Sequence, residues 1–342
     1  MNARIVLLVL ALWPGIAGAQ GFAGLGSDAA GFAQPQPGTT LTFPADHGAH
    51  HDYRIEWWYL TASLTGADGL AYGLQWTLFR SALVPGDPAA AVWMGHAAVT
   101  TPDSHHAAER FARGDIGQAG VTAEPFAAWI DDWQMQGDTL DAVRLTASGP
   151  DFAYDMALQA QGPLVLHGDN GFSTKSAQGQ ASYYYSQPFY DIAGTLTLPQ
   201  GDVEVTGQAW LDREWSSQPL AQGQTGWDWF SLVFDDGARL MGFRLRGEPD
   251  YTAATWIAAD GSPTAYADGA FVAEPLAMHD TTAGPAVPVR WQIRLPDRGL
   301  DVTVTAINPD AWMAVSLPYW EGPVTFTGTH AGRGYLEMTG YE

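Results

Sequence analysis

A motif that occurs twice limits the folds open to this chain. Residues 57–64 read Trp-Trp-Tyr-Leu-Thr-Ala-Ser-Leu, residues 227–234 read Trp-Asp-Trp-Phe-Ser-Leu-Val-Phe, and an Asp-Gly pair follows each copy. Both copies then continue into an apolar run that carries an arginine, Arg80 or Arg244. Each copy is typical of an aromatic-rich strand, a tight turn and a returning strand. The repetition indicates a duplicated β unit.

Alternating runs occur along the rest of the chain, as in half-buried strands. They lie at residues 203–207, 302–305 and 324–327, and Val-Thr-Gly at 205–207 is echoed by Phe-Thr-Gly at 326–328. Charged residues make up only 15% of the chain, which leaves few stretches for solvated helices. One helix of a turn or two is allowed at 123–133, where Pro125 limits its length. The pattern predicts an all-β protein.

The aromatic content bears on the architecture of the two units. Antiparallel units of this size form either sandwiches or closed barrels. The chain has 15 tryptophans, 13 tyrosines and 14 phenylalanines, which is more than strand faces usually need. A barrel lumen must be filled by large side chains or left partly open for a ligand. We therefore predict two antiparallel β-barrels, with Trp57, Trp227 and Trp229 facing cores or cavities.

The amino terminus has the features of an export signal. Arg4 precedes a short apolar run, and Ala17-Gly18-Ala19 offers a cleavage site. We predict a signal peptide at 1–19 and a periplasmic or secreted protein. Because the chain has no cysteine, its stability must come from burial rather than from disulfides.

The mature chain divides at a polar segment. Residues 20–40 are rich in Gly, Ala, Pro and Gln and are predicted to form a flexible leader. The polar stretch 216–226 places the boundary between an N-terminal domain at 41–218 and a C-terminal domain at 219–342.

The formal net charge of −22 disfavours nucleic acid as a partner, because such a surface repels phosphate backbones. The sequence contains no G-x-S-x-G elbow, Walker loop or H-E-x-x-H motif, so nothing in it predicts a serine hydrolase or a bound cofactor.

Polar residues are concentrated just before the first aromatic strand. Residues 46–52 hold three histidines and two aspartates. A zinc site is one interpretation, but Gly48 disfavours the helix that such spacing needs. We prefer hydrogen bonding of His47 and His50 to buried backbone at a barrel mouth. Glu56, which follows between apolar neighbours, must be paired or protonated if buried, and Arg80 is its natural partner.

Lys175 and the Tyr-Tyr-Tyr run at 183–185 form a second candidate group. Alternation places Tyr183 and Tyr185 on one face of a strand and Tyr184 on the other. A cation beside tyrosines can orient an oxyanion or stack on a ring. The alternative is a loop clamp that closes the barrel.

The segment 210–215, Trp-Leu-Asp-Arg-Glu-Trp, is the richest in chemistry. Trp210, Asp212 and Glu214 share one face of a strand, and Arg213 and Trp215 lie on the other. Two carboxylates beside tryptophan are suited to raise the pKa of a general acid. We therefore take Asp212 and Glu214 as catalytic candidates, with a salt network through Arg213 as the alternative.

Several motifs resemble the AttH/carotenoid 1,2-hydratase family. They are Phe-Pro-x-Asp-His-Gly at 43–48 with Glu-Trp-Trp-Tyr at 56–59, Ala-Ser-Tyr-Tyr-Tyr-Ser at 181–186, Trp-Leu-Asp at 210–212, Gly-Trp-Asp-Trp-Phe at 226–230 and Gly-Tyr-Leu-Glu-Met-Thr-Gly-Tyr at 334–341. The resemblance implies two lipocalin-like (calycin) barrels in tandem and chemistry on long apolar molecules, such as addition of water to a carotenoid double bond. Arg213 stands where the hydratases have histidine, and residues 241–245 lack their Tyr-x-Asp.

Three functions follow from these observations. The leading hypothesis is an exported protein that binds an elongated apolar ligand, a lipid or a polyene. The second is a hydratase-like or cyclase-like enzyme that uses a carboxylic acid in the same cavity, and the third is an adaptor beside a membrane exporter with filled barrels. The sequence does not define the oligomeric state. The residues expected to contact the ligand are Glu56, Trp57, Tyr59, Arg80, Lys175, Tyr183, Tyr185, Trp210, Trp215, Trp227 and Trp229.

Overall fold

The computed structural model describes residues 29–218 and 220–341. The predicted signal peptide and the first part of the predicted leader lie outside this range. The described part of the leader is held to the body of the protein: Ala33 N–H donates to the Asp52 carbonyl (2.9 Å), and Gln36 N–H donates to the Tyr183 hydroxyl (2.8 Å). Residues 29–40 are thus less free than their Gly- and Pro-rich composition predicts, because their backbone finds partners on the first barrel.

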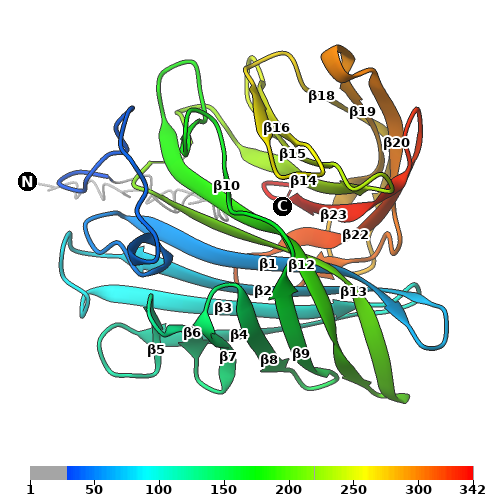
Figure 1. The fold of residues 1–342 in the computed structure, drawn as a ribbon, viewed down its shortest axis with the longest axis horizontal. Coiled ribbons are helices and arrows are strands. Elements are labelled where there is room, and N and C mark those ends of the chain that lie inside the picture. The colour runs from blue at the N-terminus through cyan, green and yellow to red at the C-terminus, as the bar shows by residue number, and fades with distance from the viewer. Residues whose placement is uncertain (1–28, 219, 342) are drawn as a thin grey trace, which may run out of the picture.

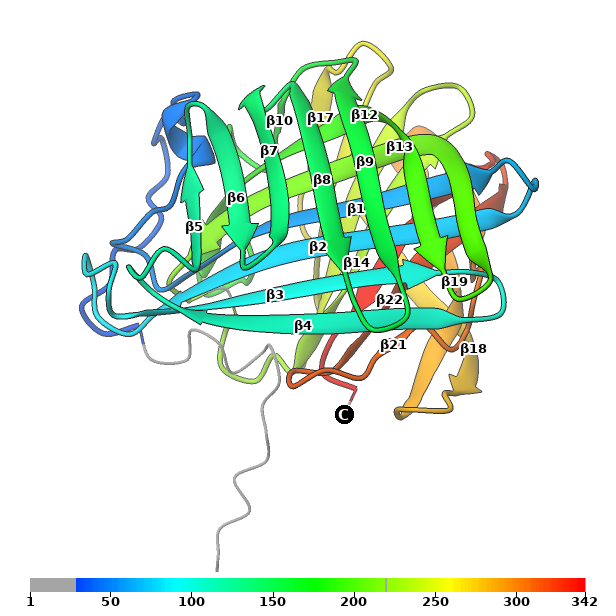
Figure 2. The same cartoon turned by 90° about the horizontal axis from the view of Figure 1, so that it is seen from below.

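The first sheet has thirteen antiparallel strands in the order β4-β3-β2-β1-β13-β12-β9-β8-β7-β6-β5, with β10 and β11 paired to β12. Its strands are β1 (Ile55–Gly66), β2 (Ala71–Ala82), β3 (Ala91–Thr100), β4 (His105–Arg113), β5 (Ala119–Thr122), β6 (Phe126–Ile130), β7 (Trp133–Thr139), β8 (Ala142–Ser148), β9 (Ala153–Ala160), β10 (Val165–Leu166), β11 (Phe172–Thr174), β12 (Ala181–Leu198) and β13 (Gly201–Ser216). The sheet curls so far that β6 contacts β2, β3 and β4, and Figure 2 shows β5–β9 crossing β1–β4.

The second sheet has ten antiparallel strands in the order β17-β16-β15-β14-β23-β22-β20-β19-β18, with β21 paired to β22. Its strands are β14 (Gly226–Phe234), β15 (Arg239–Arg246), β16 (Tyr251–Ile257), β17 (Pro263–Tyr266), β18 (Val272–Asp280), β19 (Ala286–Leu295), β20 (Leu300–Ala306), β21 (Trp312–Met313), β22 (Tyr319–Gly328) and β23 (Gly332–Met338). This sheet curls until β18 contacts β15, and it lies against the first sheet where β23 contacts β1 and β22 contacts β2 (Figure 1).

The predicted fold class is confirmed: the protein is all-β and consists of two lipocalin-like antiparallel barrels in tandem. Among the described residues the only helices are two short 3₁₀ turns, η2 (Ala45–His47) and η3 (Pro296–Arg298). The short helix allowed at 123–133 is absent; Phe126–Ile130 forms β6 instead, paired with β5 and β7. No helix in the described part of the chain is long and apolar enough to cross a membrane.

The duplicated motif occupies equivalent places in the two barrels. β1 pairs with β2 and with the closing strand β13, and β14 pairs with β15 and with the closing strand β23. Both hairpins carry an acid–arginine pair, but not at equivalent positions: Glu56 faces Arg80, whereas Asp228 faces Arg244 closer to the turn. The shorter echo is not equivalent: residues 205–207 lie on β13, whereas 326–328 lie on β22.

Each barrel interior is filled by large side chains. Trp58, Trp76 and Trp133 lie in the core of the first barrel, and Trp291 and Trp320 lie in the core of the second. A third apolar cluster joins the outer faces of the two sheets and includes Tyr59, Trp210, Tyr184, Trp229 and Phe243. The aromatic residues thus pack two cores and the junction between the barrels.

Candidate functional site

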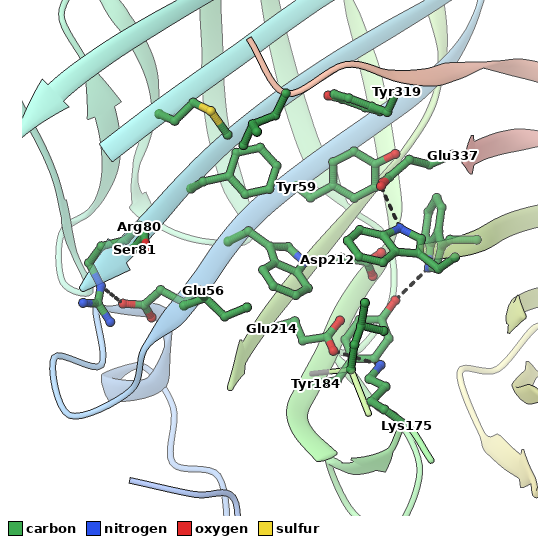
Figure 3. A pocket seen from close by; sticks show the side chains of 18 of the residues that line it. Glu56, Tyr59, Arg80, Ser81, Lys175, Tyr184, Asp212, Glu214, Tyr319 and Glu337 are labelled. Atoms are coloured by element: carbon green, nitrogen blue, oxygen red, sulfur yellow. Dashed lines mark hydrogen bonds and ion pairs between the residues drawn. The ribbon is translucent and has the colours of Figure 1, made fainter. Parts of the chain in front are cut away.

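A cavity of about 320 Å³ lies between the two barrels (Figure 3). Strands β1, β2, β3, β12 and β13 of the first barrel form one side, and β14, β15, β22 and β23 of the second form the other. The sequence predicts a ligand space inside a barrel lumen. The cavity lies outside both lumens instead, because the alternating strands turn aromatic side chains outward as well as inward. Its apolar wall includes Trp57, Phe79, Met94, Trp227, Trp229, Phe243 and Leu245.

Asp212 is the most strongly perturbed acid of β13 in this cavity. Its side chain is only 2% exposed, and burial raises the pKa of the carboxyl to about 7. Three groups oppose that rise by donating hydrogen bonds to the carboxylate: the Ser186 hydroxyl, the Trp210 indole N–H (2.7 Å) and the Tyr184 hydroxyl. Burial wins, so a protonated and an ionised form of Asp212 are both accessible at neutral pH.

A histidine stands behind Asp212. His167 is fully buried, its Nε2 lies 2.6 Å from the Ser186 oxygen, and its ring packs on Tyr184 with centroids 4.2 Å apart. Burial lowers the pKa of His167 to about 3, so the ring is neutral. Since Ser186 donates to Asp212, a neutral His167 with its proton on Nε2 donates to Ser186 and fixes the direction of the chain His167–Ser186–Asp212.

Glu214 and Lys175 form an ion pair on the cavity wall. Lys175 Nζ lies 2.8 Å from Glu214 Oε1, and both side chains are about 7% exposed. The Ser182 hydroxyl donates to the same carboxylate, and the ammonium lies over the rings of Tyr184 (4.8 Å) and Phe243 (4.3 Å). The two carboxylates predicted on one face of β13 therefore have different surroundings, because Glu214 pairs with a cation and Asp212 forms no ion pair with any basic side chain that the structure describes.

The second barrel contributes a carboxyl of its own. Glu337 on β23 borders the cavity, and the Trp227 indole N–H donates to its Oε1 (2.8 Å). Burial raises the pKa of Glu337 to about 7. The cavity thus carries an acid of near-neutral pKa from each barrel.

The region of Glu56 forms a structural ion cluster. Glu56 is fully buried between Arg80 and Arg213, with Arg213 Nη2 2.6 Å from Oε2, and these two cations hold the pKa of the carboxyl well below its usual range although burial opposes them. His50 stacks on Trp215 and contacts Glu56.

The predicted hydrogen bonding of His47 and His50 to buried backbone is found only in part. His47 is buried, and its ring contacts the Tyr185 hydroxyl (2.6 Å) rather than backbone, while His50 lies between Asp46 and Glu56. In the part of the chain that the structure describes, no group of three or more His, Asp or Glu side chains is arranged to hold a metal ion.

The structure brings together most of the predicted ligand-contacting residues. Those that border the cavity are Glu56, Trp57, Tyr59, Arg80, Lys175, Trp227 and Trp229, with the catalytic candidates Asp212 and Glu214. Four do not border it. Tyr183, Tyr185 and Trp215 point into the first barrel, on the opposite face of their strands, and Trp210 lies behind Asp212. Tyr183, Tyr185 and Trp215 miss the cavity because it lies outside the barrel, whereas Trp210 is on the outer face and contacts the cavity only through Asp212.

Other cavity residues were not singled out from the sequence. Tyr184, Tyr319, Phe243 and Glu337 belong to this group. Once the duplicated strands β1 and β14 are known to turn Trp57 and Trp229 outward, alternation identifies the outward residues of the paired strands, Tyr184 on β12 and Glu337 on β23.

The tandem barrels and their shared acidic cavity define a class of double-barrel lipocalin-like proteins. The sequence matches the AttH-like family over residues 34–341, and the chain belongs to that family. No curated protein matches it.

Solved structures share the whole architecture. A crystal structure from Nitrosomonas europaea, whose protein is assigned as an AttH, is 34% identical and superposes with a TM-score of 0.82 over 91% of this chain and 100% of that one. Kievitone hydratase from Nectria haematococca is 14% identical, with a TM-score of 0.68 over 90% of this chain and 95% of its own. CghA in complex with Sch210972 is 12% identical, with a TM-score of 0.55 over 84% and 89%. The latter two share the fold.

Proposed function

We propose that the protein binds an apolar, unsaturated small molecule between its barrels and transfers a proton to it from Asp212, as in a hydratase. The observation that carries the proposal is the position of Asp212: a carboxyl that has no cationic partner among the described residues, enclosed in an aromatic cavity, with a pKa raised to about 7. A general acid is most effective when its pKa lies near the working pH.

The cavity wall indicates the class of substrate. Aromatic and aliphatic side chains form most of it, and the volume of about 320 Å³ lies at the lower end for small-molecule sites. Such a space suits a compact ring system or one end of a longer polyene. The rings of Trp57, Trp227 and Trp229 offer π faces to a carbocation.

The reaction balances with these groups. The Asp212 proton adds to one alkene carbon, the π bond breaks, and the neighbouring carbon becomes a cation. A water oxygen then bonds to that carbon and loses a proton to a base, so that alkene and water yield an alcohol. The similarity to a hydratase of the same fold supports this class of reaction.

Binding without chemistry is the second candidate, favoured by the apolar wall. It does not explain Asp212, because a buried unpaired carboxyl destabilises a protein and an apolar ligand gains nothing from it.

The test uses deuterium oxide, in which reversible protonation of an alkene leaves deuterium in the substrate even when little alcohol accumulates. Wild type, Asp212→Asn and the surface control Asp235→Asn are incubated with a panel of polyenes and aromatic alkenes, and products are read by mass spectrometry. We expect incorporation with wild type and control and at least a hundred-fold loss with Asp212→Asn, as for removal of a general acid. An Asp212→Asn variant as active as wild type would refute acid catalysis by Asp212. Wild type that binds N-phenylnaphthylamine yet labels no compound of the panel would favour the binding protein.

We also propose that the protein is exported, on the evidence of the charged and apolar pattern at residues 1–19. The mass of the protein recovered from the periplasm or medium of an expressing bacterium should correspond to a chain that begins near Gln20. An intact Met1 on that product would contradict cleavage.

A further inference from the structure

The second barrel carries a pair of carboxyls at the junction of the two sheets, one of which shares the cavity with Asp212. Glu337 on β23 borders the cavity, and Glu321 on β22 lies directly opposite it in the strand register. Asp212 lies on β13 of the first barrel, so the cavity has carboxyls on two walls (Figure 3).

Glu321 lies behind the cavity in dry surroundings. Its side chain is 1% exposed, it accepts a hydrogen bond from the Tyr59 hydroxyl (2.7 Å) at Oε1, and Oε2 has no hydrogen-bond partner among the described residues. Neither Glu321 nor Glu337 forms an ion pair with a basic side chain in the part of the chain that the structure describes. Two anions cannot lie side by side here without a cation, so the pair retains a proton at neutral pH.

The two carboxyls differ in what stabilises their charge. Glu337 accepts the Trp227 indole N–H at Oε1, and it is partly accessible, as expected for a side chain that borders the cavity. Burial raises the pKa of Glu321 well above its usual range. The retained proton therefore stays on Glu321, and Glu337 is the member that ionises. The titratable groups that face Glu337 from neighbouring elements are Tyr59 of β1, Tyr319 and Glu321 of β22, and Glu214 of β13.

We infer that Glu337 is the second catalytic residue of the cavity, the base that takes the proton from the attacking water while Asp212 protonates the alkene. This inference rests on the function proposed above. In the step, Asp212 loses a proton to carbon, the water oxygen bonds to the carbocation, and the released proton joins the Glu337 carboxylate. Water that enters after the alcohol leaves returns the proton from Glu337 to Asp212.

Glu321 is a positioning residue in this scheme. As a neutral acid behind Glu337, it holds Tyr59 through the hydrogen bond to Oε1 and keeps a second negative charge away from the base. It does not touch the cavity wall.

The first experiment needs no substrate. The chain has ten glutamates, so the protein labelled with ¹³C at glutamate Cδ gives few carboxyl resonances to follow against pH. We expect one resonance with a midpoint near neutral pH, absent from Glu337→Gln and retained in the surface control Glu274→Gln. N-phenylnaphthylamine should raise that midpoint by roughly one unit, because a ligand in the cavity desolvates the carboxyl further. In Trp227→Phe the midpoint should rise as well, because the ionised Glu337 carboxylate loses the hydrogen bond from the indole N–H.

The second experiment uses any compound that wild type labels with deuterium. The hydration rate should rise with pH as Glu337 ionises and fall as Asp212 ionises. In Glu337→Gln the hydration rate should be at least a hundred-fold lower and should no longer rise with pH. The inference is overturned, whatever the activity, if no glutamate titrates near neutral pH or if the titrating resonance persists in Glu337→Gln. It is also overturned if N-phenylnaphthylamine does not change the midpoint of that resonance. Wild-type hydration by Glu337→Gln would overturn it too and leave the role of Asp212 intact, whereas an active Asp212→Asn would overturn the proposed function itself.

Discussion

Replacing Asp212 by asparagine should make the protein more stable at alkaline pH. The carboxyl has a pKa of 3.8 in an unfolded chain and about 7 in the folded protein. Below pH 4 both states carry the neutral acid. As the pH rises, the unfolded chain ionises first, so wild type loses stability until the folded carboxyl also ionises near pH 7.

The size of the effect follows from the difference between the two pKa values. At about 1.4 kcal/mol per unit, a difference of about three units corresponds to roughly 4 kcal/mol of stability lost by wild type between pH 4 and pH 8. Asparagine carries no charge at either pH. Its amide oxygen can still accept the bonds from Ser186 and Trp210, at a cost of about 1 kcal/mol for imperfect geometry. We therefore expect Asp212→Asn to be more stable than wild type by roughly 3 kcal/mol at pH 8, and slightly less stable at pH 4.

The assay is urea unfolding of wild type, Asp212→Asn and the exposed control Asp235→Asn at several pH values. Far-ultraviolet circular dichroism and tryptophan fluorescence are followed together, because two barrels need not unfold in one step. The informative quantity is the change with pH of the difference between variant and wild type. If Asp212→Asn is destabilised by the same amount at pH 4 and pH 8, the carboxyl ionises normally in the folded protein and the argument for a buried acid fails.

Four further substitutions, used in three experiments, test the charges around the cavity and the first barrel. Lys175→Met should lower the unfolding free energy by about 3–5 kcal/mol, because Glu214 would stay buried without its cation; adding Glu214→Gln should restore most of the loss in urea unfolding, and an unrestored double variant would contradict this. Glu56→Gln should cost about 3–5 kcal/mol at pH 7, since two buried guanidinium groups lose their counter-charge; a near-wild-type midpoint would show that the cluster is unimportant. Ser186→Ala removes a donor to the Asp212 carboxylate, so the pKa of Asp212 in the folded protein should rise further. The loss of stability with pH should then continue to a higher pH than in wild type, and an end at a lower pH would exclude the bond.

The fold could be predicted from the sequence because local signals agree with the tertiary structure. The alternating runs and Asp-Gly turns marked β1, β2, β14 and β15, and the duplicated motif identified the first strand of each barrel. The local sequence of residues 123–133 does not decide between helix and strand, because its alanines fit both. Pairing with β5 and β7 decides its conformation, and that pairing is not encoded within the segment.

The sequence predicts the residues of the cavity less completely than it predicts the fold. Alternation correctly separates Asp212 from Arg213, and Tyr184 from its neighbours, but it does not say which face is the inner one. Assigning the ligand to a lumen selected Tyr183 and Tyr185, whose rings belong to the core of the first barrel. Glu337 is part of a family motif but is not selected as a site residue from the sequence, because it is 125 residues from Asp212 in the chain and meets the cavity only through the contact of β23 with β1.

Duplication explains why the cavity lies between the barrels. A filled lumen gains stability from close packing, and an open space inside it would cost roughly 24 cal/mol for each Å³ left empty. Between two curved sheets the outer faces cannot meet along their whole length, so a space remains there without opening either core. The residues that border this space are released from the demands of core packing, and they include the acids that burial perturbs, Asp212 and Glu337. Each comes from a closing strand, β13 or β23, that pairs with the aromatic strand of the duplicated motif. The duplicated strand pattern thus places two carboxyls on facing walls, and their hydrogen-bond donors differ: Ser186 and Trp210 on one side and Trp227 on the other.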